Sequence, residues 1–255
     1  MKRLLLPPIT IAATAVAAFA VADIAHEALG HGGGCVAAGG KIVSVSTTFE
    51  ECTIRSRIVD GAGPAGGILV AMLVWLWARF LPPRSPATHM FLCFVFAFAA
   101  FWNFGYLIKS GLTNQGDWAF VIADWQPPFF WRAAITVTGV VLYALSVRAL
   151  AALLKRDLDA SQGEMPIMIC LTAYIAAIVT ACLAASLDPR GPSTILSDAL
   201  PSSLGALGLP LAGWALQRRI PDARLAIAPS RAWIAGGAIA GAAFVSILGP
   251  GLPFQ

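Results

Sequence analysis

Charged residues are scarce in this sequence. Only 12% of its 255 residues are Asp, Glu, Lys or Arg, whereas a soluble globular domain carries about 25%. The sequence also contains no hydrophilic stretch long enough to form a separate soluble domain, and no internal repeat. These absences exclude an ordinary soluble protein and a repeat array. With 58% of its residues in the hydrophobic set, the chain is predicted to be a single membrane domain covering residues 1–255.

Apolar runs of transmembrane length recur along most of the chain. A helix needs about 20 apolar residues to cross a bilayer. We expect spans near residues 5–25, 62–81, 88–108, 132–153, 166–187, 202–217 and 232–249. The sixth run is the least regular, because Gly205, Gly208, Pro210 and Gly213 interrupt it. The prediction is an all-α, polytopic transmembrane helix bundle of about six or seven spans that contacts the lipid bilayer.

Basic residues are scattered rather than gathered into a patch. The net charge is +4, but the 17 Lys and Arg lie in ones and twos between apolar runs, which argues against nucleic acid as a partner. In a seven-span bundle, eleven of them share a side with the N-terminus and six lie opposite. The six are Lys41, Arg55, Arg57, Lys109, Arg132 and Arg190. The positive-inside rule then predicts an integral, multi-pass protein of the inner or plasma membrane with a cytoplasmic N-terminus.

The first apolar run also has features of a secretory signal. Lys2 and Arg3 precede an Ala-rich apolar stretch with several A-x-A sites. However, the apolar run continues as far as His26, and six further spans follow it. We therefore expect the first span to be retained as a transmembrane helix.

Histidine is rare, and two of the three His lie together. They belong to HEALGH, residues 26–31, at the end of the first apolar run. Ionisable groups inside a membrane are expensive and usually functional. Because neutral imidazoles bind zinc, and three protein ligands plus water make a catalytic site, His26 and His31 are candidate ligands and Glu27 is the candidate general base. The alternative is an ordinary polar helix end at the water interface, without metal.

The spacing of the two His is unusual. Three residues separate Glu27 from His31, so the two His stand at positions i and i+5. On an ideal α-helix such positions point about 140° apart, whereas i and i+4 point about 40° apart. A single-turn π-bulge absorbs one extra residue and restores a shared face, and Gly30 makes that distortion easier. Binding of one metal by both His therefore requires a π-type distortion across HEALGH.

A third ligand must lie on the same side of the membrane as HEALGH. Two spans separate HEALGH from the loop that follows the third span, so Asp117 and Asp124 both satisfy this condition. Asp117 is the better candidate, because Gly111 and Gly116 permit the loop to fold inward. The alternative is that Asp117 is simply a surface-loop residue.

Two further polar residues are candidates for supporting roles. Asp23 lies three residues before His26, one turn earlier on the same face, where it could orient this imidazole through its second nitrogen. A solvated or helix-packing Asp is the alternative. Asn103 lies inside the third span, where it either positions a substrate carbonyl or hydrogen-bonds another helix. His89, at the far end of that span, is expected to be an interfacial residue on the opposite side.

The segment after HEALGH has a β pattern. The glycines at 32–34 are expected to end the helix. Residues 41–60 are rich in Val, Ile and Thr and are split by Glu50-Glu51, which predicts a short β-hairpin. An exposed edge of this hairpin could hold an extended peptide, and Glu50 and Glu51 are fallback metal ligands. Cys35 and Cys52 flank the hairpin, and they either form a disulfide or remain two thiols.

These features together resemble the site-2 protease class of intramembrane zinc metallopeptidases. The resemblance covers residues 9–131: HEALGH ending the first span, the hairpin, a Gly-Pro start to the second span in AGPAGG (62–67), and a Gly/Asp loop after the third. In this family two His and one Asp hold Zn2+, and the Glu after the first His activates water to cut a peptide bond. The resemblance implies that His26, His31 and Asp117 bind Zn2+ and that Glu27 is the catalytic base.

The sequence departs from the family pattern at two places. The family motif HExxH is lengthened by one residue, and an Asn-x-x-Pro…Asp-Gly pattern is replaced by Asn103 without the Pro and by Gly116-Asp117-Trp118. The lengthened motif is similar to the HELLGHG of the dipeptidyl peptidase III family, which binds zinc through both His. In addition, site-2 proteases generally have their site nearer the cytoplasm, whereas the charge distribution places HEALGH on the other side.

The resemblance implies a membrane-embedded zinc metallopeptidase that hydrolyses a peptide bond of a membrane-associated protein. Its core would be residues 1–131, which contain all three His, and residues 132–255 would add further transmembrane helices. The alternatives are a non-catalytic polytopic membrane protein, such as a transporter or assembly factor, and a zinc hydrolase with a non-peptide substrate.

Overall fold

The fold is built from long apolar helices. The computed structural model describes residues 2–81, 85–158, 163–225 and 229–254. Within these residues seven helices are long and apolar enough to cross a membrane, so all seven predicted spans are confirmed and the chain is a multi-pass membrane protein. The seven are Pro7–Ala37, Arg57–Phe80, Pro86–Thr113, Pro128–Asp157, Pro166–Ala185, Ile195–Arg219 and Arg231–Leu248. Arg84, one of the eleven basic residues on the N-terminal side, lies outside the described residues.

Several spans are composed of more than one helical element. The first consists of α1 (Lys2–Ile24), the π-helix η1 (Ala25–Gly32) and α2 (Gly33–Ala37). The next four are α3 (Arg57–Phe80), α4 (Pro86–Thr113), α6 (Pro128–Leu154) with the 3-10 turn η2 (Lys155–Asp157), and α7 (Pro166–Ala185). The sixth consists of η3 (Ile195–Ala199), α8 (Leu200–Gly205) and α9 (Gly208–Arg219), and the seventh of α10 (Arg231–Ala243) and η4 (Phe244–Leu248). The short helix α5 (Asp117–Val121) lies between α4 and α6.

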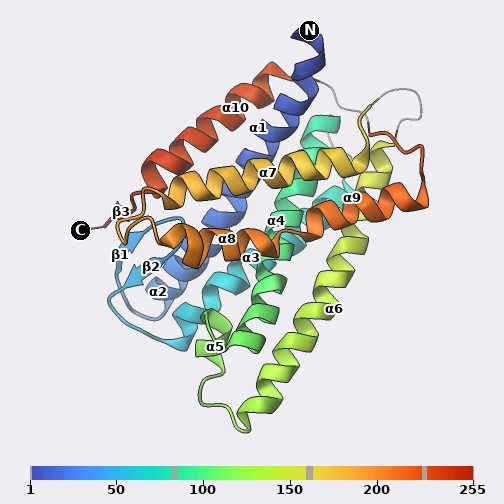
Figure 1. The fold of residues 1–255 in the computed structure, drawn as a ribbon. Coiled ribbons are helices and arrows are strands. Elements are labelled where there is room, and N and C mark those ends of the chain that lie inside the picture. Colours follow the sequence, from blue (N-terminus) through green and yellow to red (C-terminus); the bar gives the residue numbers. More distant parts are fainter. Residues whose placement is uncertain (1, 82–84, 159–162, 226–228, 255) are drawn as a thin grey trace.

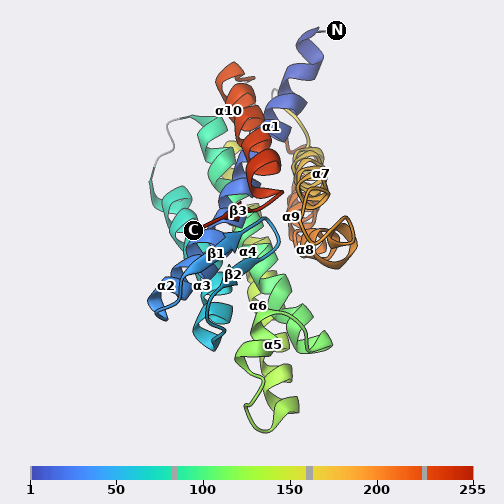
Figure 2. The ribbon, with the colours of Figure 1, turned by 90° about the vertical axis from the view of Figure 1, so that its left-hand side faces the viewer.

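The third span, α4, is the centre of the bundle. It packs against α1, α3 and α6, and Phe94, Phe98 and Phe101 along it are fully buried. Figure 1 shows α7 and the pair α8 and α9 crossing α1 and α4 at a steep angle, and Figure 2 shows the same helices nearly end-on, at one side of the bundle. The helices α7, α8 and α9 therefore cover one side of α1 and α4.

The first helix is longer than the sequence predicts. We expected the glycines at 32–34 to end it, but Gly32 and Gly33 keep helical dihedral angles and the helix continues to Ala37. Gly34 faces α3 so closely that an added Cβ would lie 2.4 Å from the Cβ of Ala62. The helix turns only at Gly39, where φ is +84°. Close packing against α3 therefore outweighs the low helix propensity of glycine.

The sixth span is broken where glycine and proline interrupt its sequence. The break lies between α8 and α9, near Gly205 and Gly208. The Tyr143 hydroxyl donates a hydrogen bond of 2.7 Å to the Gly205 carbonyl, and Gly208 leaves room for the ring of Phe101. A backbone carbonyl that loses its helical hydrogen bond inside a membrane protein needs another donor. At this break the donor is Tyr143 of α6.

A small antiparallel sheet lies beside the end of the first span. The predicted hairpin is confirmed: β1 (Ile42–Val45) pairs with β2 (Glu50–Cys52). A third strand, β3 (Leu252–Pro253), comes from the C-terminal end and pairs with the other edge of β1, which the sequence did not predict. Cys35 and Cys52 form a disulfide, which is one of the two possibilities that the sequence left open. The pairing also brings the C-terminal segment to the end of the bundle that carries HEALGH.

Candidate metal centre

The two histidines of HEALGH converge because the helix widens there. Residues Ala25–Gly32 form a π-helix, in which backbone hydrogen bonds run from i to i+5 rather than i+4. His26 and His31 therefore lie one turn apart on one face, with ring centroids separated by 4.9 Å. The distortion required by the spacing is present, and it extends over the whole motif rather than a single bulge.

Asp117 completes the group. Its Oδ2 atom lies 3.4 Å from Nε2 of His26 and 3.3 Å from Nε2 of His31. Each of the three residues offers one ligand atom, and these atoms lie within 4.8 Å of one another. The structure thus brings together the three residues that the sequence analysis selected, as a possible metal-binding group.

The approach to Asp117 depends on two residues with positive φ. Asn114 ends α4 in the left-handed conformation (φ 57°), and Gly116 follows with φ 86°. A Cβ at Gly116 would also lie 2.4 Å from the Tyr106 hydroxyl. Gly111, the other glycine expected to allow the inward fold, does not act as a hinge: it lies within α4 and packs against Arg132 and Thr136 of α6.

Both imidazole rings are held through their Nδ1 atoms. Nδ1 of His26 lies 3.1 Å from Oδ1 of Asn103, whose own amide donates to the Ala99 carbonyl at 2.7 Å. Nδ1 of His31 donates to the Val59 carbonyl at 2.8 Å. Hydrogen bonds of this kind fix the tautomer that leaves Nε2 free to bind a metal. The partner of His26 is therefore Asn103, and the orienting hydrogen bond considered for Asp23 is not formed.

Glycines of α3 give these side chains their space. A Cβ at Gly63 would lie 2.2 Å from Nε2 of His31, and one at Gly67 would lie 2.1 Å from Nδ2 of Asn103. A Cβ at Gly30 would lie 2.6 Å from the Cα atom of Gly63. Glycines at the start of the second span therefore allow close packing, and Gly63 and Gly67 border the histidine network directly.

The three side chains of the group also interact electrostatically. Burial opposes ionisation of Asp117, but its contacts with His26 and His31 lower the pKa of Asp117 to about 2. The Oδ2 atom of Asp117 is buried and lies between the two imidazole nitrogens. Among the described residues, Oε2 of Glu27 has no hydrogen-bond partner, and Glu27 is only 5% exposed. Two nitrogens and one carboxylate oxygen are ligands that zinc accepts.

The other candidate ligands lie elsewhere. Asp124 is exposed and pairs with Arg57. Glu51 is exposed and accepts a hydrogen bond of 3.3 Å from the Ser44 hydroxyl. Glu50 lies near the sulfur atoms of Cys35 and Cys52, but the disulfide removes those thiols as ligands. The fallback ligands are therefore not part of the His26, His31 and Asp117 group.

A cavity of about 210 Å³ opens beside the three residues. Its walls come from both halves of the chain, because α7, η3, α8 and η4 contribute to it together with α1, α3 and α4. The lining residues contributed by the second half are Tyr174, Ala177, Ile178, Ala181, Asp198, Ala199, Ser202, Ser203, Ala206 and Phe244. Sequence reasoning missed these residues. Most of them are apolar residues in Ala- and Leu-rich helices, so their residue types do not distinguish them from ordinary packing positions.

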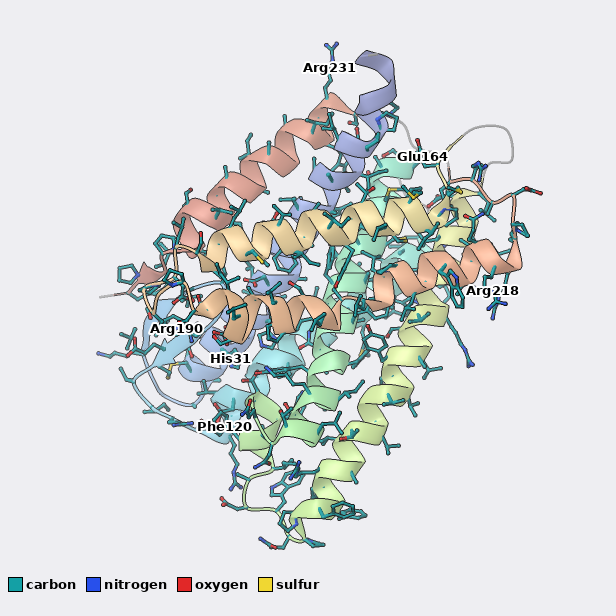
Figure 3. The ribbon with its side chains drawn as sticks, in the orientation of Figure 1. His31, Phe120, Glu164, Arg190, Arg218 and Arg231 are labelled. Carbon is teal, nitrogen blue, oxygen red and sulfur yellow. A yellow bond between two sulfur atoms is a disulfide. The ribbon has the colours of Figure 1, made fainter. Side chains whose placement is uncertain are left out.

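A polar network ties the hairpin to the second half of the chain. Arg190, in the loop after α7, bonds to Asp188 at 3.1 Å, to Asp198 at 3.3 Å and to the Thr48 hydroxyl at 2.7 Å. Its guanidinium also lies 4.3 Å from the centroid of the Phe49 ring. Figure 3 labels Arg190 and His31 on the same side of the molecule in this view. Because Thr48 and Phe49 line the cavity, this network fixes part of its wall.

The third histidine lies far from this site. His89, expected at an exposed interface, is 1% exposed. It lies in the first turn of α4, and its Nδ1 atom is 2.5 Å from Oδ2 of Asp157. The position at the opposite end of the bundle is as expected, but the carboxylate of Asp157, in the turn η2 that follows α6, covers the ring. His89 therefore acts as a buried link between α4 and α6.

Comparison with protein-family models, with curated proteins and with solved structures finds no match for this chain. A functional assignment must therefore be based on the geometry of the site itself.

Proposed function

We propose that this protein is a membrane-embedded zinc metallopeptidase that hydrolyses a peptide bond of a membrane-associated protein. The observation that carries the proposal is the convergence of His26 Nε2, His31 Nε2 and Asp117 Oδ2, in a cavity that also contains the unpaired Oε2 of Glu27. Zinc, when bound by these three residues, supplies a Lewis acid that polarises a carbonyl and lowers the pKa of water to about 7.

Each residue of the site then has a definite task. His26 and His31 present Nε2, because Asn103 and the Val59 carbonyl occupy the two Nδ1 atoms. Asp117 supplies the third ligand atom from the start of α5. Glu27 accepts the proton of the attacking water at Oε2 and delivers it to the leaving amine. Trp102 stacks on the His26 ring, with centroids 4.8 Å apart, and shields it from water.

The position of the sheet favours a peptide as the substrate. Both β1 and β2 contact η1, the helix that carries the two histidines. A strand beside a hydrolytic site can hold an extended peptide through main-chain hydrogen bonds. One edge of β1 is paired with β3, so an incoming peptide would pair with the free edge of β2. A non-peptide substrate would gain nothing from this arrangement.

Zinc content and hydrolysis test the proposal together. Detergent-purified wild type is expected to hold about one zinc per chain, and His26→Ala, His31→Ala and Asp117→Ala are each expected to lose it. Glu27→Gln should retain zinc but lose hydrolysis of a membrane-protein substrate, because it removes the base and leaves the ligands. Asp124→Ala, on the same loop as Asp117, is the matched control and should retain both. Wild type that binds no zinc after resupply would contradict the proposal.

A further inference from the structure

The cavity contains a carboxylate that the proposed reaction does not use. Asp23 belongs to α1, lines the cavity and is 2% exposed. Its Oδ1 atom is buried and has no hydrogen-bond partner among the described residues. An unpartnered carboxyl group of this kind is unfavourable inside a membrane protein unless a ligand supplies the missing donor.

The position of Asp23 is deeper than that of the proposed base. Asp23 precedes Glu27 by four residues, which corresponds to about 6 Å along the helix axis and the same helix face. Phe19 lies one further turn along α1, and its ring contacts those of Phe98, Trp102 and Phe244 at centroid distances of 5.6 to 6.5 Å. These aromatic rings surround the inner arm of the cavity, which we define by Phe19, Asp23, Phe98, Trp102 and Phe244.

The charge of the cavity is strongly one-sided. Its charged lining residues in the described part of the chain are one lysine, Lys109, and six acidic residues: Asp23, Glu27, Glu50, Asp60, Asp117 and Asp198. Even with a divalent ion bound, the lining remains net negative. Such a site attracts a cationic group and repels an anionic one. Of the acidic residues, Asp23 alone lies in the apolar inner arm.

We propose that Asp23 is a specificity-determining residue that binds a lysine-like side chain of the substrate adjacent to the scissile bond. This inference rests on the proposed peptidase function and names the substrate feature that the site selects. A lysine side chain has a four-carbon stem and a terminal ammonium with three donors, and the stem is long enough to cover one helical turn. The stem packs against the aromatic rings of the inner arm, and the ammonium donates to the Asp23 carboxylate.

A set of peptide hydroxamates tests this inference, because the hydroxamate binds the zinc while the neighbouring side chain enters the inner arm. Three probes differ only in that side chain: lysine, norleucine, which has the same stem without the ammonium, and glutamate. Their dissociation constants are measured by calorimetry on zinc-loaded protein in detergent. Wild type is expected to bind the lysine probe about 10- to 100-fold more tightly than the norleucine probe, as a buried charge-assisted hydrogen bond gives. The glutamate probe should bind most weakly.

The variants separate recognition from structural effects. Asp23→Asn should bind the norleucine probe as wild type does but lose the preference for lysine. Asp198→Asn, which removes a different acidic residue of the same cavity, should keep that preference. Asp23→Glu, which places the carboxylate one methylene nearer, should shift the preference from lysine to its shorter homologue ornithine. Asp23→Glu therefore tests the inference even if Asp23→Asn cannot be purified.

Two results would overturn the inference in different ways. The first is that wild type binds the lysine and norleucine probes equally, or that Asp23→Asn keeps the preference for lysine. Either observation would show that Asp23 does not select lysine, and neither would contradict the metal site. Failure of zinc-loaded wild type to bind even the norleucine probe would show that the proposed metal site does not accept a substrate-like ligand. The inference would then fall together with the proposed function.

Discussion

The contact between Gly63 and His31 allows a sharp prediction. In Gly63→Ala the new Cβ would lie 2.2 Å from Nε2 of His31 and 2.4 Å from two ring carbons, whereas ordinary contacts are about 3.5 to 4.0 Å. The ring must therefore move by roughly 1 Å or more, well beyond the tolerance of about 0.2 Å for a metal ligand distance. A shift of α3 cannot readily relieve this overlap, because the α3 backbone at Gly63 packs directly against Gly30.

We therefore expect Gly63→Ala to lower zinc affinity by at least about 100-fold, the upper end of the effect of disturbing a ligand's support. The overpacking should also reduce the free energy of unfolding by about 1 to 3 kcal/mol. Zinc affinity is measured by competition with a chromogenic chelator, and stability by thermal unfolding of the zinc-free protein in detergent.

Gly61→Ala is the matched control for this experiment. It makes the same Gly-to-Ala change at the start of the same helix, but its Cβ would meet only Val121, at an ordinary contact distance of 3.4 Å. Alanine has the higher helix propensity, so stability should be unchanged or rise by up to about 1 kcal/mol. Full zinc affinity in Gly63→Ala, or an equal loss in Gly61→Ala, would refute the reasoning, because His31 would then not depend on the space that Gly63 provides.

Three further predictions concern the surroundings of the site. Asn103→Leu should lower zinc affinity by about 10- to 100-fold, because it removes the partner of His26 Nδ1. Asp23→Asn should leave zinc affinity unchanged. A larger loss of affinity in Asp23→Asn than in Asn103→Leu, measured by chelator competition, would assign the orienting role to Asp23. Replacing Cys35 and Cys52 together by serine should reduce the free energy of unfolding by about 3 kcal/mol, since the bridge spans a separation of 17 residues; an unchanged unfolding temperature would contradict this. Although burial opposes it, hydrogen bonds from Arg190 and Thr48 lower the pKa of Asp188 below the usual value of an Asp side chain. A lowered folded-state pKa contributes stability that is present above the unfolded pKa and is lost as pH falls through the folded one, so the stability difference between wild type and Asp188→Asn should be constant above about pH 5 and shrink below about pH 4. A difference that grows on acidification would reject this account.

Most of the fold could be predicted because the membrane imposes a simple rule. A span must be long and apolar, so seven apolar runs yield seven helices. The irregular features were harder. The glycines at 32–34 have low helix propensity, yet they remain helical, and Gly34 is the one of the three that packs closely against α3. The pairing of β3 with β1 joins residues that are about two hundred positions apart, and a two-residue strand leaves no periodic signal in the sequence.

The ligand group could be predicted for a different reason. The third ligand had to lie on the same side of the membrane as HEALGH, which restricted it to a few loops. Asp117 follows Gly116 in one of these loops, and the positive φ of Gly116 permits the inward turn. Its orienting neighbours were harder to choose. Asp23 and Asn103 are both polar residues in apolar helices, and only the rotation of α1 relative to α4 decides which of them reaches Nδ1 of His26. That rotation depends on packing across the bundle, which local sequence does not encode.

Two independent features bear on the side of the membrane that the site faces. The charge distribution puts eleven of the 17 basic residues on the N-terminal side, and the positive-inside rule then predicts that the end carrying His31 lies outside the cytoplasm. The disulfide between Cys35 and Cys52 lies at that same end, and disulfides persist in oxidising compartments. Both features favour a site that faces the extracytoplasmic side, the reverse of the orientation general among site-2 proteases. A substrate would then reach the cavity from outside the cytoplasm, through the end at which Arg190 holds the hairpin in place.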